Sequence, residues 1–431
     1  MWHIKKRSLC EWLTLYMFVT PFLLNFLQDL LHIPGIVKYT MDVAWIVVLL
    51  CMLFMREQLV YKKILPVLIF LIGYVMYVSV AYLFQYQSIF YFLWGIRNNM
   101  RYFVAFFAFV YFFDKDDIGF CLKFIDVVFA VHVVVSFFQF FVMGYKWDYL
   151  GGIFGVQLGC NGNSMILIVV VCIKSLLMYM HGKERLIITL IKCSAALIIA
   201  AMVELKFFFV IFLLTLIVVA LITKFSWKKI VIIGGVTLAV SFASNIFTAI
   251  WGADSALTLD RIIELVTSKS YSSARDLGRF TAIPTISDTF LVDISQKMFG
   301  LGLGNCDTSS FSICNTPFYQ SHSYLNYNWF SSAFTFIETG YVGLLFSIMF
   351  FVVVGICAIR LKLRNRSSQL YTDISIVTCV ICIALFFYNS SLRTDIAYII
   401  YFMLALPFVS TFSESVSQRY LPNQVYARHG G

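Results

Sequence analysis

The sequence predicts an all-α integral membrane protein with about twelve transmembrane helices and one long, partly helical extracytoplasmic loop. Hydrophobic residues make up 61% of its 431 positions and charged residues only 13%, whereas a soluble domain is about 45–50% apolar and about 25% charged. Apolar stretches of roughly 20 residues, the length that crosses a bilayer, recur along the chain. The 45 Phe and 24 Tyr suit lipid contact and interfacial belts.

The apolar stretches define the spans one by one. A helix rises 1.5 Å per residue, so about 20 residues cross a hydrocarbon core of about 30 Å. As one helix, residues 186–223 would be about 57 Å long, so we expect two spans there with a tight turn near Glu204-Leu-Lys206. The predicted spans are 9–28, 39–55, 64–84, 97–113, 118–143, 163–180, 186–203, 205–223, 229–251, 333–359, 374–391 and 396–411.

Basic residues in the short loops predict the orientation, because Lys and Arg concentrate in cytoplasmic loops. With the N-terminus inside, 18 Lys and Arg fall in inner segments and six in short outer segments. We therefore expect cytoplasmic termini and account for the net charge of +10 by topology, without a nucleic-acid partner. The predicted domains are a nine-helix transmembrane region (1–251), the outer loop (252–332), three transmembrane helices (333–411) and a cytoplasmic tail (412–431).

Two arginines lie unusually deep in the fourth span. Arg101 is about 18 Å above the inner end of that helix, and Arg97 lies four residues earlier, so both project from one face. Charged residues in a membrane are costly and often functional. Arg97 and Arg101 either snorkel to the outer headgroups or form an anion clamp in a cavity open to the outside.

The outer loop and a nearby turn carry further cations. Arg275 and Arg279 would share a face if residues 273–283 are helical. Two guanidinium groups on one face match a pyrophosphate, because Arg binds phosphate oxygens bidentately; a solvated helix face is the alternative. Lys206, beside Glu204, is either a third outer cation or half of a local ion pair.

Other polar residues lie at or inside the spans. His322 immediately precedes the tenth span. Glu338 lies one to two turns inside that span, and an intramembrane carboxylate is a candidate functional group. His132 and Gln139, seven residues apart on one face, are expected to make packed hydrogen bonds rather than bind a ligand. Cys306 and Cys314 share an oxidising outer loop, and we hypothesise a disulfide between them.

No Walker A, GxSxG, HExxH or DxD-type metal motif accompanies these residues, and the eleven Cys show no metal-binding spacing. We therefore expect neither a nucleotide nor a metal cofactor. Chemistry outside the cytoplasm must then use an activated donor, of which a lipid pyrophosphate is the obvious example. Its leaving group supplies the driving force, and cations stabilise the charge that develops on it.

Three motifs lie before and inside the tenth span: Phe299-Gly-Leu-Gly-Leu-Gly-Asn305, His322-Ser-Tyr-Leu325 and Glu338-Thr-Gly340-Tyr-Val-Gly343. Together they resemble the closing motif of the bacterial O-antigen polymerase and O-antigen ligase superfamily. In that family a glycine-rich turn precedes a His-Asn-x-x-Leu-like stretch and a Glu-x-Gly-x-x-Gly helix. Ser323 replaces the usual Asn here.

Upstream segments extend the resemblance to nearly half the chain. Gly278-Arg279 resembles the family's Gly-Arg helix, and Gly152-Ile-Phe154 with Asn161-Gly-Asn163 resembles its Gly-x-Phe…Asn segment. Where the family often has Ser-Arg at the outer end of a middle span, this chain has Glu204-Leu-Lys206.

The resemblance implies a GT-C-like, metal-independent, inverting glycosyltransferase on the outer face of the bacterial cytoplasmic (inner) membrane. Its donor would be a glycan on undecaprenyl pyrophosphate, and its partners would be these lipid-linked substrates, membrane lipids and a chain-length regulator. Histidine exchanges protons near neutral pH, which suits general base catalysis. The implied site residues are His322 as base, Glu338 orienting His322 or the acceptor, and Arg275, Arg279, Arg97, Arg101 and Lys206 on the donor pyrophosphate.

Three functions remain open. A polymerase adds the growing glycan to another lipid-linked repeat unit, whereas a ligase transfers it to lipid A core or another acceptor. We favour the polymerase of lipopolysaccharide or another surface polysaccharide, because polymerases are the more numerous and divergent branch. Twelve spans also suit a lipid-linked oligosaccharide flippase. Flippases, however, usually have short loops and cations deep in a central cavity, whereas this chain has an outer loop of about 80 residues and cations near the outer edge.

Overall fold

A computed structural model describes residues 7–54, 62–85, 87–224, 226–252, 263, 267, 268, 270, 275–309, 311–365 and 367–420. The regular elements of these residues are all helices. Before the outer loop these are α1 (Leu9–Leu31), α2 (Thr40–Phe54), α3 (Leu65–Gln85), α4 (Ile89–Phe112), α5 (Lys115–Phe141), α6 (Asn161–Met180), α7 (Leu186–Met202), α8 (Lys206–Ile222) and α9 (Trp227–Trp251). After it come α14 (Ser331–Leu363), α15 (Gln369–Tyr388) and α16 (Ala397–Tyr420).

The chain is a multi-pass, all-helical membrane protein. Among the described residues, eight helices are long and apolar enough to cross a membrane, and three shorter stretches, Leu186–Met202, Lys206–Ile222 and Ala397–Thr411, are also apolar. Every predicted span overlaps one helix. The predicted last span ends at residue 411, where the apolar part of α16 also ends, and α16 itself continues as a helix to Tyr420. Residues 421–431 of the predicted tail lie outside the described part of the chain.

Local sequence determines where several helices begin and end. A capping box of Ser8 and Glu11 begins α1, and one of Asp114 and Asp117 begins α5, so the first free amides of each helix have side-chain partners. The predicted tight turn between α7 and α8 is confirmed. Glu204 takes a left-handed φ of +58° there, which reverses the chain within a few residues.

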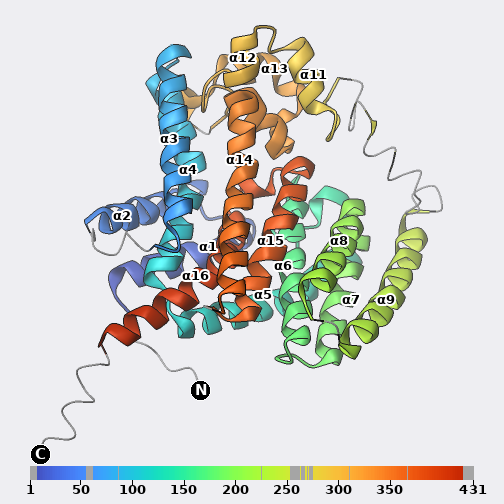
Figure 1. The fold of residues 1–431 in the computed structure, drawn as a ribbon. Helices are drawn as coiled ribbons and strands as arrows, with labels where there is room; N and C mark the ends of the chain where they lie inside the picture. The colour runs from blue at the N-terminus through green and yellow to red at the C-terminus, as the bar shows by residue number, and fades with distance from the viewer. Residues whose placement is uncertain are drawn as a thin grey trace, which may run out of the picture.

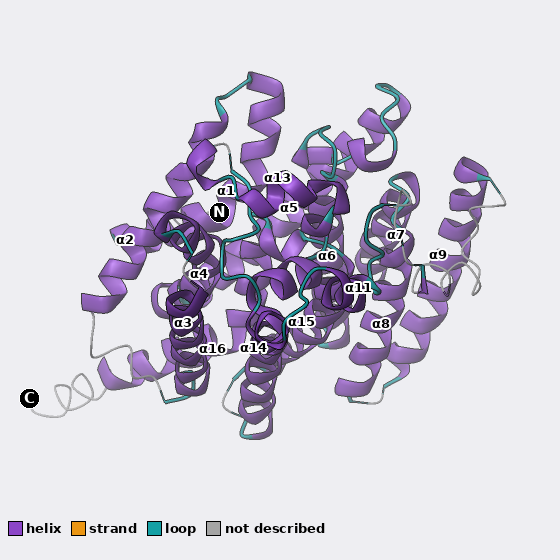
Figure 2. Ribbon diagram, turned by 90° about the horizontal axis from the view of Figure 1, so that it is seen from above, coloured by secondary structure: helices purple, strands orange, loops and turns teal. Residues whose placement is uncertain are grey.

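The outer loop folds into a helical cap at one end of the bundle (Figure 1). The cap is formed by α11 (Ala282–Thr289), α12 (Ile294–Phe299) and α13 (Pro317–His322). This confirms the prediction of a partly helical loop. In the view from above, α6 and α15 lie inside the bundle and α9 lies at its margin beside α7 and α8 (Figure 2), in keeping with the greater burial of α6 and α15.

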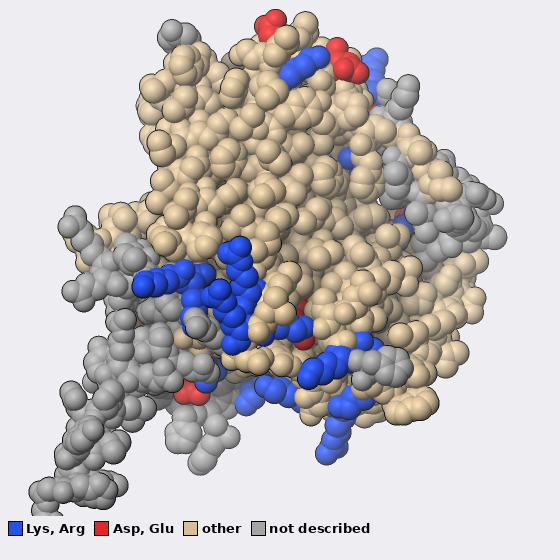
Figure 3. All heavy atoms as spheres, in the orientation of Figure 1, with Lys and Arg blue, Asp and Glu red and all other residues tan. Residues whose placement is uncertain are grey.

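Loops that the charge bias placed on one side of the membrane meet at the opposite end of the bundle. Asp373, at the start of α15, accepts bonds from Lys362 Nζ at 2.5 Å and His181 Nε2 at 2.9 Å. Lys362 also donates to the carbonyl of Ile222 at 2.7 Å. Lys and Arg side chains gather at this end, away from the cap (Figure 3). The sequence-based grouping of these loops is therefore reproduced in three dimensions.

The cap is joined to the bundle at a break in α14. Gly340 interrupts this helix with φ +61° and ψ −163°, a backbone region that is essentially restricted to glycine. The break frees backbone carbonyls of the preceding turn, which need new donors because unpaired polar groups are costly inside a membrane. They accept from outside the helix: Ile337 O from Leu301 N at 2.8 Å, Glu338 O from Gly302 N at 2.9 Å and Thr339 O from Tyr77 Oη at 2.5 Å.

We predict that Gly340→Ala destabilises the fold, whereas Gly355→Ala in the same helix does not. A Cβ at Gly340 would lie 2.4 Å from the carbonyl carbon of Met298, and one at Gly355 would make ordinary contacts of 3.6 Å. Backbone strain alone at Gly340 would cost about 1–3 kcal/mol. Thermal unfolding in detergent should show a lower midpoint for Gly340→Ala only; equal midpoints would mean that the break in α14 is dispensable.

Candidate functional site

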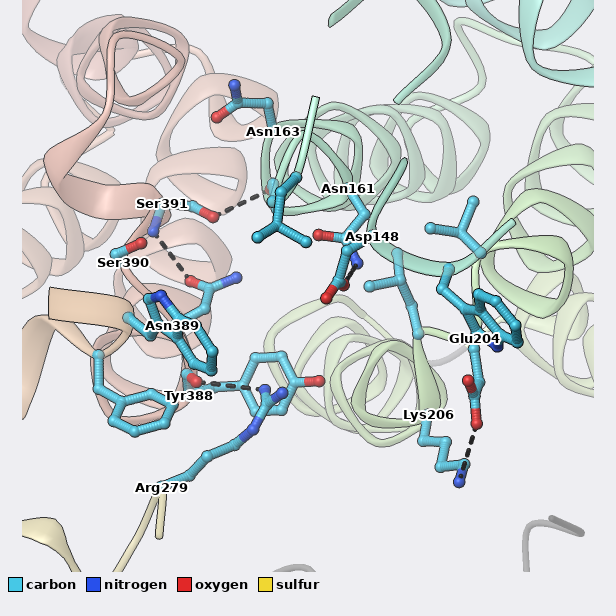
Figure 4. A pocket seen from close by; sticks show the side chains of 18 of the residues that line it. Asp148, Asn161, Asn163, Glu204, Lys206, Arg279, Tyr388, Asn389, Ser390 and Ser391 are labelled. Carbon is cyan, nitrogen blue, oxygen red and sulfur yellow. Dashed lines mark hydrogen bonds and ion pairs between the residues drawn. The ribbon is translucent and has the colours of Figure 1, made fainter. Parts of the chain in front are cut away.

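A polar pocket of about 900 Å³ opens beside the cap. Its walls come from the α5–α6 connection, the α7–α8 turn, Arg279 of the outer loop, the residues before α14 and the α15–α16 connection (Figure 4). The lining combines amides, hydroxyls, two carboxylates and two cations with aromatic rings. Its members include Trp147, Asp148, Asn161, Asn163, Glu204, Lys206, Arg279, Trp329, Tyr388, Asn389, Ser390, Ser391 and Thr394.

Two buried polar residues of α5 hold the wall between α5 and α6. Gln139 accepts from the Gly152 amide at 2.7 Å and donates to its carbonyl at 2.9 Å. His132 contacts the Ser164 hydroxyl at 2.9 Å. A Cβ at Gly152, whose φ is +58°, would lie 2.4 Å from His132 Nδ1, so a larger residue does not fit. The prediction that His132 and Gln139 make packed hydrogen bonds is confirmed.

A second anchor fixes the part of this wall that carries Asp148. On α1, the Asp29 carboxylate accepts from the Val156 amide at 2.8 Å and from the Gln157 side chain at 2.9 Å. Asn161 Nδ2, in the first turn of α6, donates to Asp148 Oδ1 at 2.5 Å. Both side chains of that last bond line the pocket (Figure 4). Asp148 is a candidate that the sequence analysis missed, because no motif singles it out.

The α7–α8 turn brings Glu204 and Lys206 to the pocket. Lys206 Nζ lies 3.2 Å from Glu204 Oε1, with side-chain exposures of 36% and 27%. The local ion pair is therefore present, and its two members also line the pocket. Trp251, at the end of α9, braces the turn by donating to the Ala201 carbonyl at 2.7 Å.

Arg279 enters the pocket from the outer loop, whereas Arg275 does not belong to its lining. The predicted helix through both residues is wrong: 275–281 forms turns and bends, and α11 begins only at Ala282. Residues 273 and 274 of that predicted helix lie outside the described residues. The guanidinium of Arg279 lies 4.0 Å from the centroid of the Tyr388 ring and donates to the Tyr388 carbonyl at 3.3 Å.

The α15–α16 connection forms a further wall that the sequence analysis missed. Ser391 Oγ donates to the Gly162 carbonyl at 2.9 Å, and Thr394 Oγ1 donates to Asn163 Oδ1 at 3.0 Å. These bonds join the connection to the first turn of α6. The available signal was the polar run Asn389-Ser-Ser391 between two apolar spans.

Arg97 and Arg101 do not form the expected clamp in this pocket. The guanidinium of Arg97 binds both oxygens of Asp42 on α2, with Nη2–Oδ2 at 2.7 Å. Arg101 binds Asp395 at 2.7 Å and donates to the hydroxyl of Tyr102. Both cations thus join α4 to neighbouring segments, because a carboxylate from elsewhere in the chain reaches each of them.

His322 and Glu338 contact different parts of the molecule. The His322 ring stacks on Phe318 with centroids 4.5 Å apart, and its Nδ1 lies 3.2 Å from the Phe318 carbonyl. Glu338, almost completely buried, accepts from the Gly304 amide at 2.8 Å. Neither belongs to the pocket lining. The Glu338 carboxylate is engaged by the glycine-rich turn rather than by His322, and its predicted role in orienting the acceptor stays a prediction.

The hypothesised disulfide is also wrong. Cys306 and Cys314 are both free and buried. Burial raises the pKa of each thiol, which keeps both in the protonated form. The Tyr327 hydroxyl donates to the Cys306 carbonyl at 2.5 Å, so this part of the loop is held by packing and hydrogen bonds.

Chemically, the pocket suits a hydroxylated ligand that carries an anionic group. Amide and hydroxyl side chains exchange hydrogen bonds with sugar hydroxyls, and Arg279 and Lys206 can bind phosphate oxygens. Within the described residues, no group of three or more His, Cys, Asp or Glu side chains could hold a metal ion. No known protein-family model matches the chain, and no curated protein sequence matches it either.

We predict that Glu338 acts through its acceptor oxygen rather than by proton transfer. Glu338→Gln keeps an oxygen for the Gly304 amide, whereas Glu338→Ala leaves that buried N–H unpaired, at a cost of about 1–3 kcal/mol. Hydrogen exchange at residues 301–304 should therefore accelerate in the Ala variant but not in the Gln variant. If Gln exposes the turn as fully as Ala does, the hydrogen bond to Glu338 does not hold it.

Proposed function

We propose that the chain is a glycosyltransferase that polymerises a surface polysaccharide such as O-antigen. It would transfer a growing glycan from undecaprenyl pyrophosphate to a lipid-linked repeat unit on the outer face of the bacterial cytoplasmic membrane. One observation supports this above the others. Two segments that resemble motifs of the O-antigen polymerase and ligase superfamily, containing Asn161 and Arg279, line one pocket although they are far apart in the chain. Lys206, from the turn that stands where that family often has Ser-Arg, lines the same pocket.

The pocket offers the groups that this inverting, metal-independent reaction requires. The bond between the anomeric carbon and the pyrophosphate oxygen breaks, and negative charge develops on the leaving group. Arg279 and Lys206 would stabilise that charge, as fixed cations do for developing anions. The amides of Asn161, Asn163 and Asn389 would bind sugar hydroxyls. Of the cations assigned from sequence, Arg279 and Lys206 are retained because they line the pocket.

The proposal includes a GT-C-like arrangement of twelve spans with cytoplasmic termini. The basic end of the bundle would face the cytoplasm, in line with the positive-inside rule, and the pocket beside the cap would face outward. A lipid-linked substrate could then reach the pocket from the outer leaflet. Undecaprenyl-pyrophosphate glycans, membrane lipids and a chain-length regulator would be its partners, and no cofactor is required.

Two alternative functions remain, a ligase and a flippase. A ligase would use the same pocket but transfer the glycan to lipid A core or another acceptor, so acceptor identity separates it from a polymerase. A flippase would need charged groups available along a central path. The interior pairs Arg101–Asp395 and Lys174–Asp126 instead combine charges of opposite sign, which favours a transferase.

We predict that the cap is extracytoplasmic. A cysteine introduced at Ser295, exposed on α12, should react with a membrane-impermeant maleimide in intact cells. A cysteine at Lys183, exposed between α6 and α7, should react only after permeabilisation. Native thiols give little background because most are buried. The opposite labelling pattern would invert the topology and exclude the proposed reaction at this site.

We predict that Arg279→Ala lowers transfer by about 100-fold or more, as removal of one donor to a developing anion typically does. The assay uses purified protein in lipid nanodiscs with an undecaprenyl-pyrophosphate glycan and measures product length. Lys297→Ala, on α12 outside the pocket, is the matched control. Because Arg275 is exposed and does not line the pocket, loss of activity in Arg275→Ala but not in Arg279→Ala would contradict this assignment.

A further inference from the structure

We propose that Asp148 is the catalytic base that takes the proton from the acceptor hydroxyl. This inference rests on the proposed transferase function and names a further catalytic residue of the same pocket. The acceptor oxygen would lose its proton to the Asp148 carboxylate while it forms a bond to the anomeric carbon. The bond from that carbon to the pyrophosphate oxygen breaks, and the electron pair leaves with undecaprenyl pyrophosphate.

The stereochemistry of this reaction restricts where a base can lie. Inversion brings the acceptor oxygen in opposite the leaving pyrophosphate, so the base and the phosphate-binding cation must face the sugar from different sides. Asp148 belongs to the α5–α6 connection, and Arg279 belongs to the outer loop. The two side chains line the pocket from different walls, with the Tyr388 ring packed against the guanidinium (Figure 4). A sugar can therefore be placed between carboxylate and cation.

Asp148 is also oriented for the task. Asn161 donates to Oδ1 at 2.5 Å, whereas Oδ2 has no hydrogen-bond partner among the described residues. One oxygen is thus held by the protein, and the other is available to a substrate hydroxyl. A base must come within hydrogen-bonding reach of the proton that it removes, and the place of Asp148 in the pocket lining meets this condition.

The other candidates fit this task less well. Glu204 is the second carboxylate in the described pocket lining, but it already binds the ammonium group of Lys206 at 3.2 Å. His322 lies outside the lining, and its ring contacts Phe318 and Phe290 of the cap, with centroids 4.5 and 5.4 Å away. For His322 to act as the base, the cap would have to move towards the pocket.

Asp148→Asn is the decisive variant because it removes the base but keeps an oxygen to accept the bond from Asn161. We expect transfer in nanodiscs to fall by at least about 100-fold, with binding of the undecaprenyl-pyrophosphate glycan and the unfolding midpoint unchanged. Added formate, a small carboxylate, should partly restore transfer in Asp148→Ala. Asp293→Asn, on the exposed cap, is the matched control and should retain transfer.

The outcomes separate this inference from the function on which it rests. An unaltered chain that transfers no glycan from any undecaprenyl-pyrophosphate donor would overturn the proposed function and, with it, this role. An active unaltered chain with near-normal transfer in Asp148→Asn would overturn the Asp148 assignment alone. Loss of donor binding in Asp148→Asn, without rescue by formate in Asp148→Ala, would show a structural role. If His322→Gln loses transfer while Asp148→Asn keeps it, His322 is the base.

Discussion

The break in α14 is the constraint on which the outer part of the molecule depends. A helix that stops inside a membrane leaves carbonyl groups without donors, and each unpaired group costs several kcal/mol in hydrocarbon. Here the donors come from Leu301 and Gly302 beside the cap and from Tyr77 on α3. The break would destabilise an isolated helix, but here its free carbonyl groups attach the glycine-rich turn beside the cap to the bundle. The Glu338 side chain adds another bond in the same direction by accepting from the Gly304 amide.

The pocket depends on this attachment through a short chain of contacts. The cap leads to Leu325, whose carbonyl accepts from the Leu277 amide at 3.1 Å. Leu277 is buried and lies two residues before Arg279, so this bond helps to fix where the guanidinium enters the pocket. Opposite it, the α5–α6 wall is fixed independently by Gln139 and by Asp29 of α1. The two sides of the pocket are thus held by separate contacts. A substrate can therefore occupy the space between them without breaking the contacts that hold either side.

The sequence predicted the positions of the helices well but the environment of its charges poorly. Span positions follow from local apolar length, a property of about 20 consecutive residues. Ion pairs depend on partners remote in sequence: Asp42 lies 55 residues from Arg97, and Asp395 lies 294 residues from Arg101. Sequence spacing likewise could not show that the segment around Arg279 would form turns, since the helix was assumed from an i, i+4 match. Asp148 was missed because only the folded chain brings it to Arg279 and Lys206.

The ion pairs of two outer cations explain why Lys206 remains a candidate and Arg101 does not. An exposed ion pair contributes about 0–1 kcal/mol, and the Lys206–Glu204 pair is exposed by about a third on each side. A phosphate can share Lys206 with Glu204 at little cost. The Arg101 side chain is only 9% exposed and holds Asp395, which is 33% exposed, at 2.7 Å. Removing the partner of a buried charge leaves that charge uncompensated, which is destabilising. A doubly charged ligand would have to overcome that penalty before binding there. Lys206 can therefore act as a reversible anion site, whereas the Arg101–Asp395 pair joins α4 to the segment that begins α16.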